Sequence, residues 1–328
     1  MVKKKSWVSR SFLISVCLAF LICHEEIFAQ SDQVEKFINQ MEQKHNFDRS
    51  ELSKLLGAVK SNQKVLSAMS RPSTSKPWFE FKKLFVTKNR IEKGLKFWRD
   101  NNKLLDRAEV SFGVPAEIIV AIIGVETIYG SRVGSFGVLE SLYTLGFEGQ
   151  RRRGFFLREL EEFLLLCREN SLDTRSVKGS FAGAMGVPQF MPSSYRAYAV
   201  DFDEDGKIDL WNSLSDAVGS VANYLRVHGW RTNTGVAVQV NLKNKKAYEL
   251  TKLGVKPHTP VFDLVESGVI LKSAIDKSQM AALFSLQNRK KRDYWLSFNN
   301  FYVITRYNRS LNYGIAVHRL AEILKESI

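Results

Sequence analysis

Apolar residues recur at helical spacing along most of the chain before about Thr232. This pattern predicts helices within residues 31–69, 78–112 and 150–170, and a turn-rich linker at residues 70–77. The first of these segments follows a basic, apolar N-terminus of a different character. We therefore expect a mainly helical N-terminal region from residue 30 to residue 232.

The pattern changes to an alternation of period two after Thr232, where Val236, Val238 and Val240 alternate with smaller or polar residues. Alternation of this kind is typical of half-buried strands. We predict strands at four places, followed by a helix at residues 311–325; the four strands lie at residues 236–240, 261–271, 294–298 and 301–305. The fold class is therefore α+β, mainly α, with a small β-rich subdomain at 233–305 and a closing segment at 306–328.

Residues 1–29 have the features of a secretory signal peptide. Lys3, Lys4, Lys5 and Arg10 precede a short apolar run that ends at residue 23, and Ala29 offers a small residue for cleavage. The run is too short for a comfortable membrane span, although a retained N-terminal anchor is the alternative. A lipoprotein signal at Cys23 is disfavoured, since Ile22 stands where a small residue is required. The mature chain is expected to be exported.

The net charge of the mature chain indicates which class of partner it binds. Residues 1–29 hold four of the 48 basic and two of the 34 acidic residues, so the mature chain keeps 44 and 32, a net charge of +12. Such an excess favours an anionic partner, and export argues against nucleic acid. The mature chain retains one cysteine, Cys167, in an apolar helical run, which excludes a disulfide framework and indicates a buried thiol. We expect a monomer that binds a cell-wall polymer or a membrane surface.

The most informative residue is Glu126, within the apolar run of residues 122–130. Pro115 suits the start of a buried helix and Gly130 suits its end, so Glu126 falls in the last turn. Burial and the negative helix end both raise the pKa of a carboxyl group, which favours a neutral acid. Such an acid can protonate a glycosidic oxygen. The alternative is a structural glutamate bonded to a buried Arg or to backbone amides.

Two other stretches offer polar groups among apolar surface. Ser180, Gln189 and Tyr195 lie in a Gly- and Ala-rich segment that lets backbones approach closely. A tight capped loop is the alternative, but it gives no reason for Gln189. Further on, Tyr307, Asn308, Ser310 and Tyr313 combine aromatic faces with amide and hydroxyl groups, a combination suited to sugar. Taken alone, this second stretch also fits a helix capped by Asn308 or Ser310.

The third stretch, residues 201–209, matches the first part of a calcium loop. Asp201, Asp203, Asp205 and Asp209 occupy loop positions 1, 3, 5 and 9, Gly206 occupies position 6 and Lys207 position 7. Asn212 replaces the glutamate expected at position 12, so Asp216 is a candidate to close a longer loop. The candidate ligands for Ca²⁺ are therefore Asp201, Asp203, Asp205, Lys207 and Asp216. An exposed acidic turn is the alternative.

These stretches, in this order, resemble the B type of membrane-bound lytic murein transglycosylases, which have a lysozyme-like core. The resemblance covers essentially the whole mature chain and rests on residues 126–130, 180–194, 201–211 and 306–313. It implies that Glu126 is the single catalytic acid and base and that the acidic loop binds structural calcium, with no organic cofactor. It also implies a sugar groove lined by Ser180, Phe181, Gln189, Tyr307, Asn308 and Tyr313. Phe181 departs from the family, where a Tyr is common.

The resemblance implies a lyase that acts on peptidoglycan glycan strands in the periplasm, in association with the outer membrane and with other cell-wall enzymes. It implies cleavage of the MurNAc–GlcNAc β-1,4 bond with a 1,6-anhydromuramyl product. Three alternatives remain: a hydrolytic muramidase, a non-catalytic peptidoglycan-binding protein and a calcium-sensing module. The basic runs at residues 151–153 and 289–292 are expected to attract the anionic stem peptides, unless they are only solvated charge.

Overall fold

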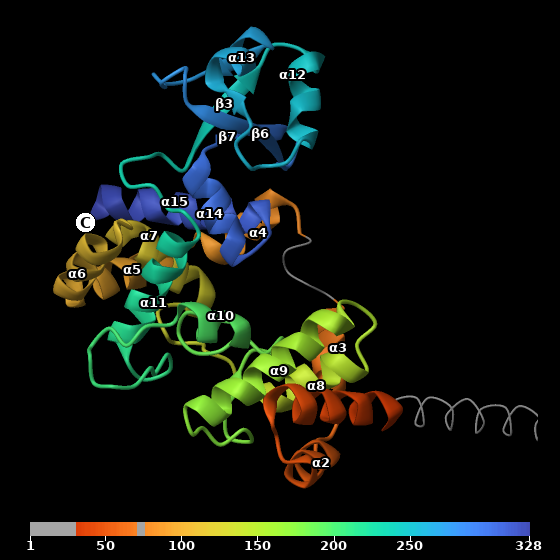
Figure 1. Ribbon diagram of the computed structural model, residues 1–328. Helices are drawn as coiled ribbons and strands as arrows, with labels where there is room; N and C mark the ends of the chain where they lie inside the picture. Colours follow the sequence, from red (N-terminus) through yellow and green to blue (C-terminus); the bar gives the residue numbers. More distant parts are fainter. Residues whose placement is uncertain (1–30, 71–75) are drawn as a thin grey trace, which may run out of the picture.

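Helices dominate the computed structural model, which describes residues 31–70 and 76–328 (Figure 1). A small sheet stands at one end of the helical part, which agrees with the predicted α+β, mainly α class. The signal peptide predicted for residues 1–29 lies outside the described residues.

The first third of the chain forms short helices where two long helical regions were predicted. Polar caps explain the breaks: Asn62 and Thr87 each accept a backbone hydrogen bond from the first turn that follows. The helices are 31–45, α2 (Arg49–Gly57), α3 (Gln63–Met69), α4 (Trp78–Phe85), α5 (Lys88–Asp100) and α6 (Asn102–Phe112).

The core is built around α7 (Ala116–Thr127), whose residues are buried on nearly every side, as predicted. The closing helix α15 (Leu311–Ser327) packs along α7. The remaining helices of this part are α8 (Val138–Phe147), α9 (Arg153–Glu169), α10 (Pro192–Tyr198) and α11 (Leu214–Val227). Among the described residues, no single helix has the length and apolar character of a membrane span. The bent pair of α6 and α7 meets that test only when taken together.

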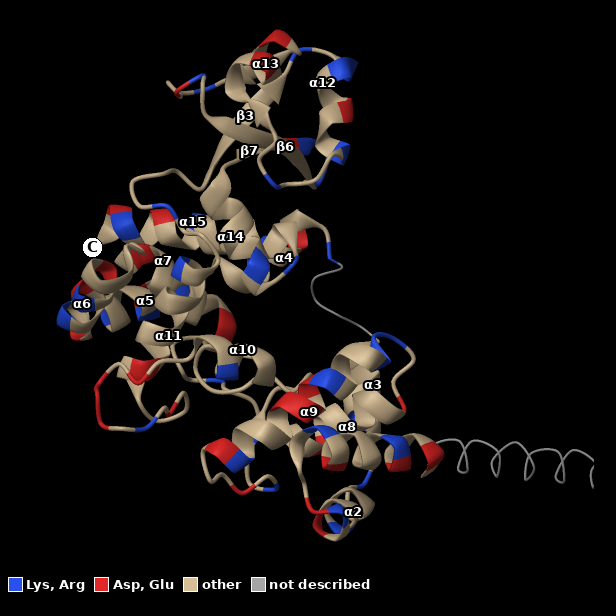
Figure 2. Cartoon of the chain, viewed as in Figure 1, with Lys and Arg blue, Asp and Glu red and all other residues tan. Residues whose placement is uncertain are grey.

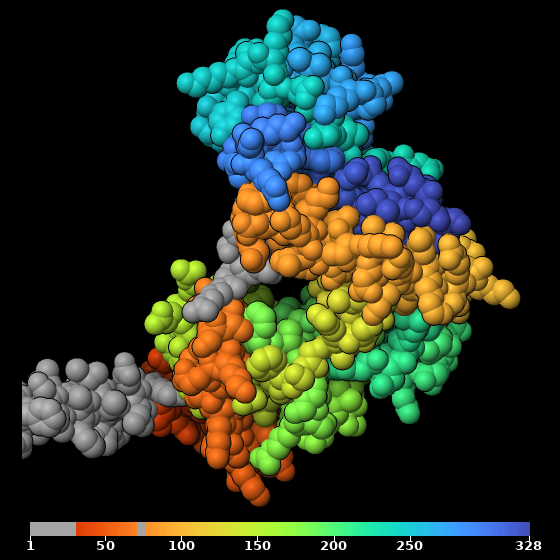
Figure 3. Space-filling model, turned by 180° about the vertical axis from the view of Figure 1, so that it is seen from behind, coloured from red at the N-terminus to blue at the C-terminus, as the bar shows by residue number. Residues whose placement is uncertain are grey.

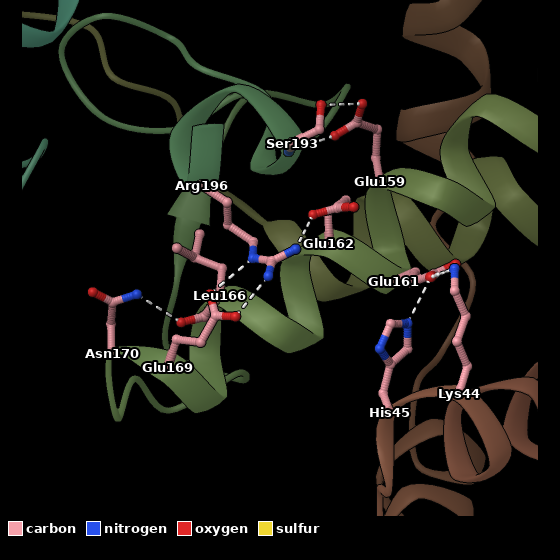
Figure 4. A network of polar contacts seen from close by, with 10 residues as sticks. All are labelled: Lys44, His45, Glu159, Glu161, Glu162, Leu166, Glu169, Asn170, Ser193 and Arg196. Atoms are coloured by element: carbon pink, nitrogen blue, oxygen red, sulfur yellow. Dashed lines mark hydrogen bonds and ion pairs between the residues drawn. The ribbon is translucent and has the colours of Figure 1, made fainter. Parts of the chain in front are cut away.

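Helix α9 holds several segments in place through its carboxylates (Figure 4). Glu161 is buried and accepts from Lys44 Nζ and pairs with His45 Nε2, each at 2.7 Å, which fixes the helix at 31–45. On another side, Glu159 accepts from the backbone and the hydroxyl of Ser193 at 3.0 and 2.8 Å. Arg196 of α10 pairs with Glu169 at 2.6 Å. These contacts place α10, and with it the segment that precedes it, against α9.

The β-rich part is an antiparallel sheet with strand order β4-β6-β7-β3-β5. A separate two-stranded pair joins β1 (Phe136–Gly137) to β2 (Lys178–Gly179). Short helices α12 (Lys245–Glu249) and α13 (Val261–Glu266) accompany the larger sheet. Its strands are β3 (Ala237–Leu242), β4 (Thr259–Pro260), β5 (Val269–Leu271), β6 (Met280–Gln287) and β7 (Arg292–Ser297).

The strand predicted at residues 301–305 is wrong, and the one predicted at residues 261–271 is right only at its end. Residues 261–271 form α13 and then β5, because Val261 and Leu264 are buried at helical spacing while Phe262 is exposed. Residues 301–305 lie in α14 (Asn299–Tyr307), whose buried side packs against α15. Packing there overrides the β propensity of Val303 and Ile304.

Candidate active site

The last turn of α7 carries Glu126, and the chain turns sharply after it. The helix ends at Thr127, three residues before the predicted end at Gly130. Ile128, Tyr129 and Gly130 follow with φ values of 52°, 58° and 78°. A β-branched residue in this left-handed region is strained, and such strain persists only where the surroundings enforce it. The turn is therefore held by tertiary contacts.

One of these contacts comes from Thr127, which is completely buried. Its hydroxyl donates to the carbonyl of Val187 at 2.9 Å and accepts from the backbone N–H of Gly130 at 3.0 Å. The residue next to Glu126 is thus bonded to the predicted Gly- and Ala-rich segment. This brings the two most informative stretches of the sequence together.

Glu126 combines partial solvent exposure with a strongly perturbed pKa. Burial by the surrounding protein raises the pKa of its carboxyl group to about 7. The hydroxyl of Tyr313 opposes this shift to a smaller extent, by stabilising the carboxylate. A carboxyl group with this pKa can both donate and accept a proton near neutral pH. The predicted protonated acid is therefore consistent with the site's electrostatics.

Tyr313 and Tyr307 pack beside this carboxyl group. Their rings are nearly parallel, at 11°, with centroids 6.4 Å apart, and the charge of Glu126 raises the pKa of both phenols in addition to burial. Tyr313 is 2% exposed, and its hydroxyl has no partner within hydrogen-bond geometry among the described residues. We regard its contact with Glu126 as electrostatic. Its burial argues against the expected contact of Tyr313 with sugar, since little of the side chain is open to a ligand.

The sequence did not reveal Arg90, a buried cation of α5. Its Nε donates to the carbonyl of Gly124 at 2.8 Å, near the C-terminal end of α7, and its Nη1 donates to the carbonyl of Leu84. In turn, the backbone carbonyl of Arg90 accepts from the hydroxyl of Tyr129 at 2.9 Å. A cation at this end of the helix satisfies a carbonyl and opposes the negative end of the helix dipole. Arg90 and Tyr129 therefore brace the turn that presents Glu126.

Replacing Arg90 with Met is expected to destabilise this turn. The change keeps the length of the side chain but removes the donors to two carbonyls, at a cost of about 1–3 kcal/mol for each carbonyl left buried and unpaired. We expect a lower melting temperature and a reduced rate of sacculus digestion. The control is Arg99→Met, an exposed position of the same helix. Equal melting temperatures for the two variants would contradict the bracing role.

Within the segment at 180–195, Ser180 and Gln189 form part of the loop itself. The Ser180 hydroxyl accepts from the backbone N–H of Ala182 and Ala184 at 3.3 and 3.0 Å. Gln189 adopts a φ of 52°, and its amide nitrogen donates to the carbonyls of Val133 and Gly186. Both bonds use the side-chain nitrogen, so the side-chain oxygen of Gln189 is the atom that can accept a hydrogen bond from another group. Ser180 and Gln189 therefore stabilise this loop, as the alternative of a tight, capped loop predicts.

Phe181 is half-buried, with its ring edge-on to Phe136 of β1 at 6.5 Å between centroids. Tyr195, in contrast, is 2% exposed. Its hydroxyl donates to the backbone carbonyl of Ile208, and its ring contacts Trp211. The predicted contact of Tyr195 with substrate is therefore wrong, since the side chain faces the acidic loop and supports it.

The junction of α14 and α15 brings Tyr307 against the same segment. Its hydroxyl donates to the carbonyl of Pro188, and its ring contacts Phe190. Asn308 ends α14 in extended backbone and is half-buried. Ser310 accepts from the backbone N–H of Tyr313 and so caps α15. The capping alternative applies to Ser310, while Tyr307 lies in the neighbourhood of Glu126.

The acidic loop gathers its first three aspartates. One carboxylate oxygen from each of Asp201, Asp203 and Asp205 lies within 4.8 Å of the others. Asp201 accepts from the backbone N–H of Asp205 and of Gly206, whose φ is 88°. Three convergent carboxylates of this spacing fit a hard cation that prefers oxygen, such as Ca²⁺.

Asp216 is not part of this group. Its two oxygens accept from the backbone N–H of Phe202 and Asp209, both at 2.8 Å, and the residue is 1% exposed. It therefore clamps the two ends of the loop, and the expectation that it closes the metal site is corrected. Lys207 can offer only its backbone carbonyl as a ligand, because its ammonium group has no atom that could coordinate a cation.

Seen from behind, the molecule is hollowed between two of its parts (Figure 3). The segment that contains α4 and α5, drawn in orange, borders this hollow on one side, and the yellow and green segments border it on the other. Those segments include the end of α7 and the residues that follow it. An open groove of this kind suits a chain-like substrate.

Comparison with known proteins identifies the class. The family model of the transglycosylase SLT domain matches residues 29–322, and the chain belongs to this family. Membrane-bound lytic murein transglycosylase B of Escherichia coli (strain K12) is 42% identical over 305 residues, which cover 90% of this chain and 83% of that protein. These findings confirm the family predicted from the sequence.

Solved structures agree. Soluble lytic transglycosylase SltB1 from Pseudomonas aeruginosa is 43% identical, with a TM-score of 0.83 over 90% of this chain and 99% of that chain. The Escherichia coli lytic transglycosylase Slt35 in complex with calcium is 39% identical, with a TM-score of 0.79 over 90% and 93%. SltB3 from Pseudomonas aeruginosa in complex with NAG-anhNAM-pentapeptide is 28% identical, with a TM-score of 0.76 over 90% and 79%. The lysozyme-like fold is thereby confirmed.

Proposed function

We propose that this peptidoglycan lytic transglycosylase cleaves the β-1,4 bond between MurNAc and GlcNAc, with Glu126 as acid and then as base. The transglycosylase activity itself follows from membership of the family. The observation that carries the mechanism is the pKa of about 7 at Glu126, at the end of a braced helix. A group with this pKa is populated in both protonation states at neutral pH.

The reaction needs one carboxyl group in two roles. Protonated Glu126 gives its proton to the glycosidic oxygen as the bond to the muramyl C1 breaks. The resulting carboxylate takes the proton of the muramyl 6-hydroxyl as that oxygen bonds to C1. The product is a 1,6-anhydromuramyl end, and Glu126 returns to its protonated state. Because the nucleophile is part of the substrate, its effective concentration is high and no water is consumed.

Most glycosidases use two carboxylates, but the glutamates in the first turns of α7 and α8 have other contacts. Glu117 accepts from Lys325 Nζ at 2.7 Å, and Glu140 accepts from the side-chain nitrogen of Asn62 at 3.2 Å. This supports a mechanism in which Glu126 acts alone. Tyr313 would then limit how far the pKa of Glu126 rises, since its hydroxyl stabilises the carboxylate.

In this proposal, the partly exposed residues around the carboxyl group of Glu126 bind the sugar. We assign the orientation of the glycan to Ser180, Gln189, Tyr307 and Asn308, with Phe181 as an apolar contact. The available oxygen of Gln189 can accept from a sugar hydroxyl, and the ring of Tyr307 offers an apolar face.

The pH dependence of kcat/KM tests the role of Glu126 as acid. Burial raises its pKa to about 7, so the protonated form prevails below pH 7 and is lost above it. We expect kcat/KM to fall about tenfold for each pH unit above that value, because the free enzyme must be protonated. Turnover of solubilised glycan strands, with circular dichroism to verify folding at each pH, measures this. A rate that stays level to pH 9 would exclude Glu126 as the donor.

The acidic loop would bind one calcium ion through Asp201, Asp203 and Asp205, with the carbonyl of Lys207 as a further ligand. The ion would have a structural role, as it would neutralise three carboxylates brought close together. A chelator is then expected to lower the melting temperature without abolishing catalysis.

We further propose that the enzyme is exported and acts as a monomer in the periplasm, in association with the outer membrane. The features of residues 1–29 support export. Sequencing the N-terminus of the protein recovered from the cell envelope tests this. Gln30 as the first residue is expected, whereas an intact Met1 would indicate a retained anchor.

A further inference from the structure

The sheet gathers positive charge at one end, where β3 ends and β6 leads into β7. Val240 pairs with Tyr294, so Leu242 lies opposite Arg292, which itself pairs with Gln287. The ends of β3, β7 and β6 are therefore level, and the three strands span roughly 10 Å at two strand spacings of about 4.8 Å. The turn after β3 and the hairpin between β6 and β7 leave the sheet from this row.

Both connections are rich in cations. Lys243, Lys245 and Lys246 follow β3, and residues 289–292 of the hairpin read Arg-Lys-Lys-Arg. All seven side chains are exposed, and none of them forms an ion pair with another described residue. We call these seven residues the cationic tip. Figure 2 shows blue segments at α12 and beside β6.

Unpaired cations crowded at one end of a sheet repel one another, so this arrangement costs stability in the free protein. Two exposed lysines outside the tip illustrate what is missing there: Lys252 pairs with Glu249 at 2.6 Å, and Lys96 pairs with Asp100 at 2.7 Å. The cost at the tip is offset when an anionic partner supplies the missing counter-charge. This makes the tip a candidate interaction surface.

We propose that the cationic tip binds the carboxylates of peptidoglycan stem peptides, outside the active site, and so holds the enzyme on the wall. The proposal rests on the proposed function, because it takes the partner to be the substrate polymer. Stem peptides repeat along the glycan, so several weak, screened contacts form at once and add. The cationic tip can release one stem peptide and bind the next while Glu126 cleaves the glycan strand.

Of the exposed apolar residues in this part, Ile270 of β5 lies beside the tip, since it pairs with Asn241, whereas Met280 and Phe262 lie away from it. Surface-binding segments pair their cations with inserted apolar side chains. Exposed Met280 begins β6, at the opposite end of that strand from the hairpin, and exposed Phe262 accompanies it, since its N–H donates to the carbonyl of Lys277. The tip itself consists of long charged side chains that suit dispersed carboxylates.

Two triple variants of the mature chain test the proposal. The tip variant is Lys243→Gln, Lys290→Gln and Lys291→Gln. The matched control is Lys256→Gln, Lys272→Gln and Lys277→Gln, which removes the same charge from exposed positions near the other end of the strands. Binding to intact sacculi is measured by co-sedimentation, and catalysis by turnover of soluble glycan strands stripped of their peptides.

We expect the tip variant to bind sacculi on the order of tenfold more weakly at low salt, while the control variant changes less than about twofold. Neither variant should alter turnover of the stripped strands, so a failure of catalysis is distinguished from a failure of the tip. Equal losses in both triples would show a general charge effect and overturn the proposal. Unchanged binding by the tip variant, or tighter binding of the wild type to phosphatidylglycerol vesicles than to sacculi, would also overturn it.

Discussion

Replacing Glu126 with Gln is expected to abolish digestion of peptidoglycan while leaving the fold intact. One proton transfer contributes about 10²–10⁴-fold to a rate, and the same carboxyl group serves both steps. We therefore expect a loss at or above the upper value. The readout is the release of muropeptides from sacculi by the wild type and the variant at equal concentration.

The matched control for this variant is Glu117→Gln, at the other end of α7. Glu117 pairs with Lys325 and lies in the first turn, so its loss is expected to lower the melting temperature slightly and to spare activity. Normal clearing of sacculi by the Glu126 variant would mean that another group is the catalyst.

The same substitution tests the burial of Glu126 through stability. The pKa of Glu126 is raised from 4.5 to about 7 by burial, so the folded state favours the neutral carboxyl group. The stability that this provides is present at low pH and is lost as pH rises through 7. The glutamine variant should therefore gain stability relative to the wild type as pH rises from about 4.5 to about 7, and the difference should stay level above that range. A difference in melting temperature that does not vary with pH would indicate an ordinary pKa.

Replacing Asp216 with Ala is expected to give the second largest effect, a loss of stability. Its buried carboxylate accepts from the N–H of Phe202 and Asp209, and the substitution leaves both partly buried donors without this acceptor. The cost is about 2–4 kcal/mol in the free energy of unfolding, which denaturant titration measures. Because Asp216 bonds to the backbone at both ends of the loop and lies outside the group of three carboxylates, this loss should occur with or without calcium.

Asp205→Asn provides the contrast, since Asp205 is exposed and belongs to the carboxylate group. This variant should match the wild type in the presence of chelator and fall below it when calcium is added. If both variants responded to calcium in the same way, the distinction between clamp and ligand would be wrong.

Long amphipathic helices, and a single charged residue within an apolar run, could be predicted from the sequence. The buried helix α7, with a single carboxylate in its last turn, follows from an apolar run between Pro115 and Gly130. The segments at 261–271 and 301–305 were not predictable by the same means. Short runs rich in Val, Ile and Phe fit a strand or a helix, and their packing partners lie far away in sequence.

The same limit applies to the site. The position of Glu126 beside Tyr307 and Tyr313 follows the predicted grouping, although no pattern indicates that Tyr313 is buried. Tyr195 offered the same polar handle as its neighbours but points into the acidic loop. Arg90 lies among solvated charges in the sequence, and only the fold brings its guanidinium to the carbonyl of Gly124.

The central claim is that Glu126 acts alone and that the substrate supplies the nucleophile. Mass spectrometry of the products formed from sacculi in ¹⁸O-labelled water tests it most directly. We predict that wild-type products end in 1,6-anhydromuramic acid and carry no label, and that the Glu126→Gln variant yields neither labelled nor unlabelled ends. Reducing muramyl ends that carry the label would show that water attacks C1, and would contradict the account.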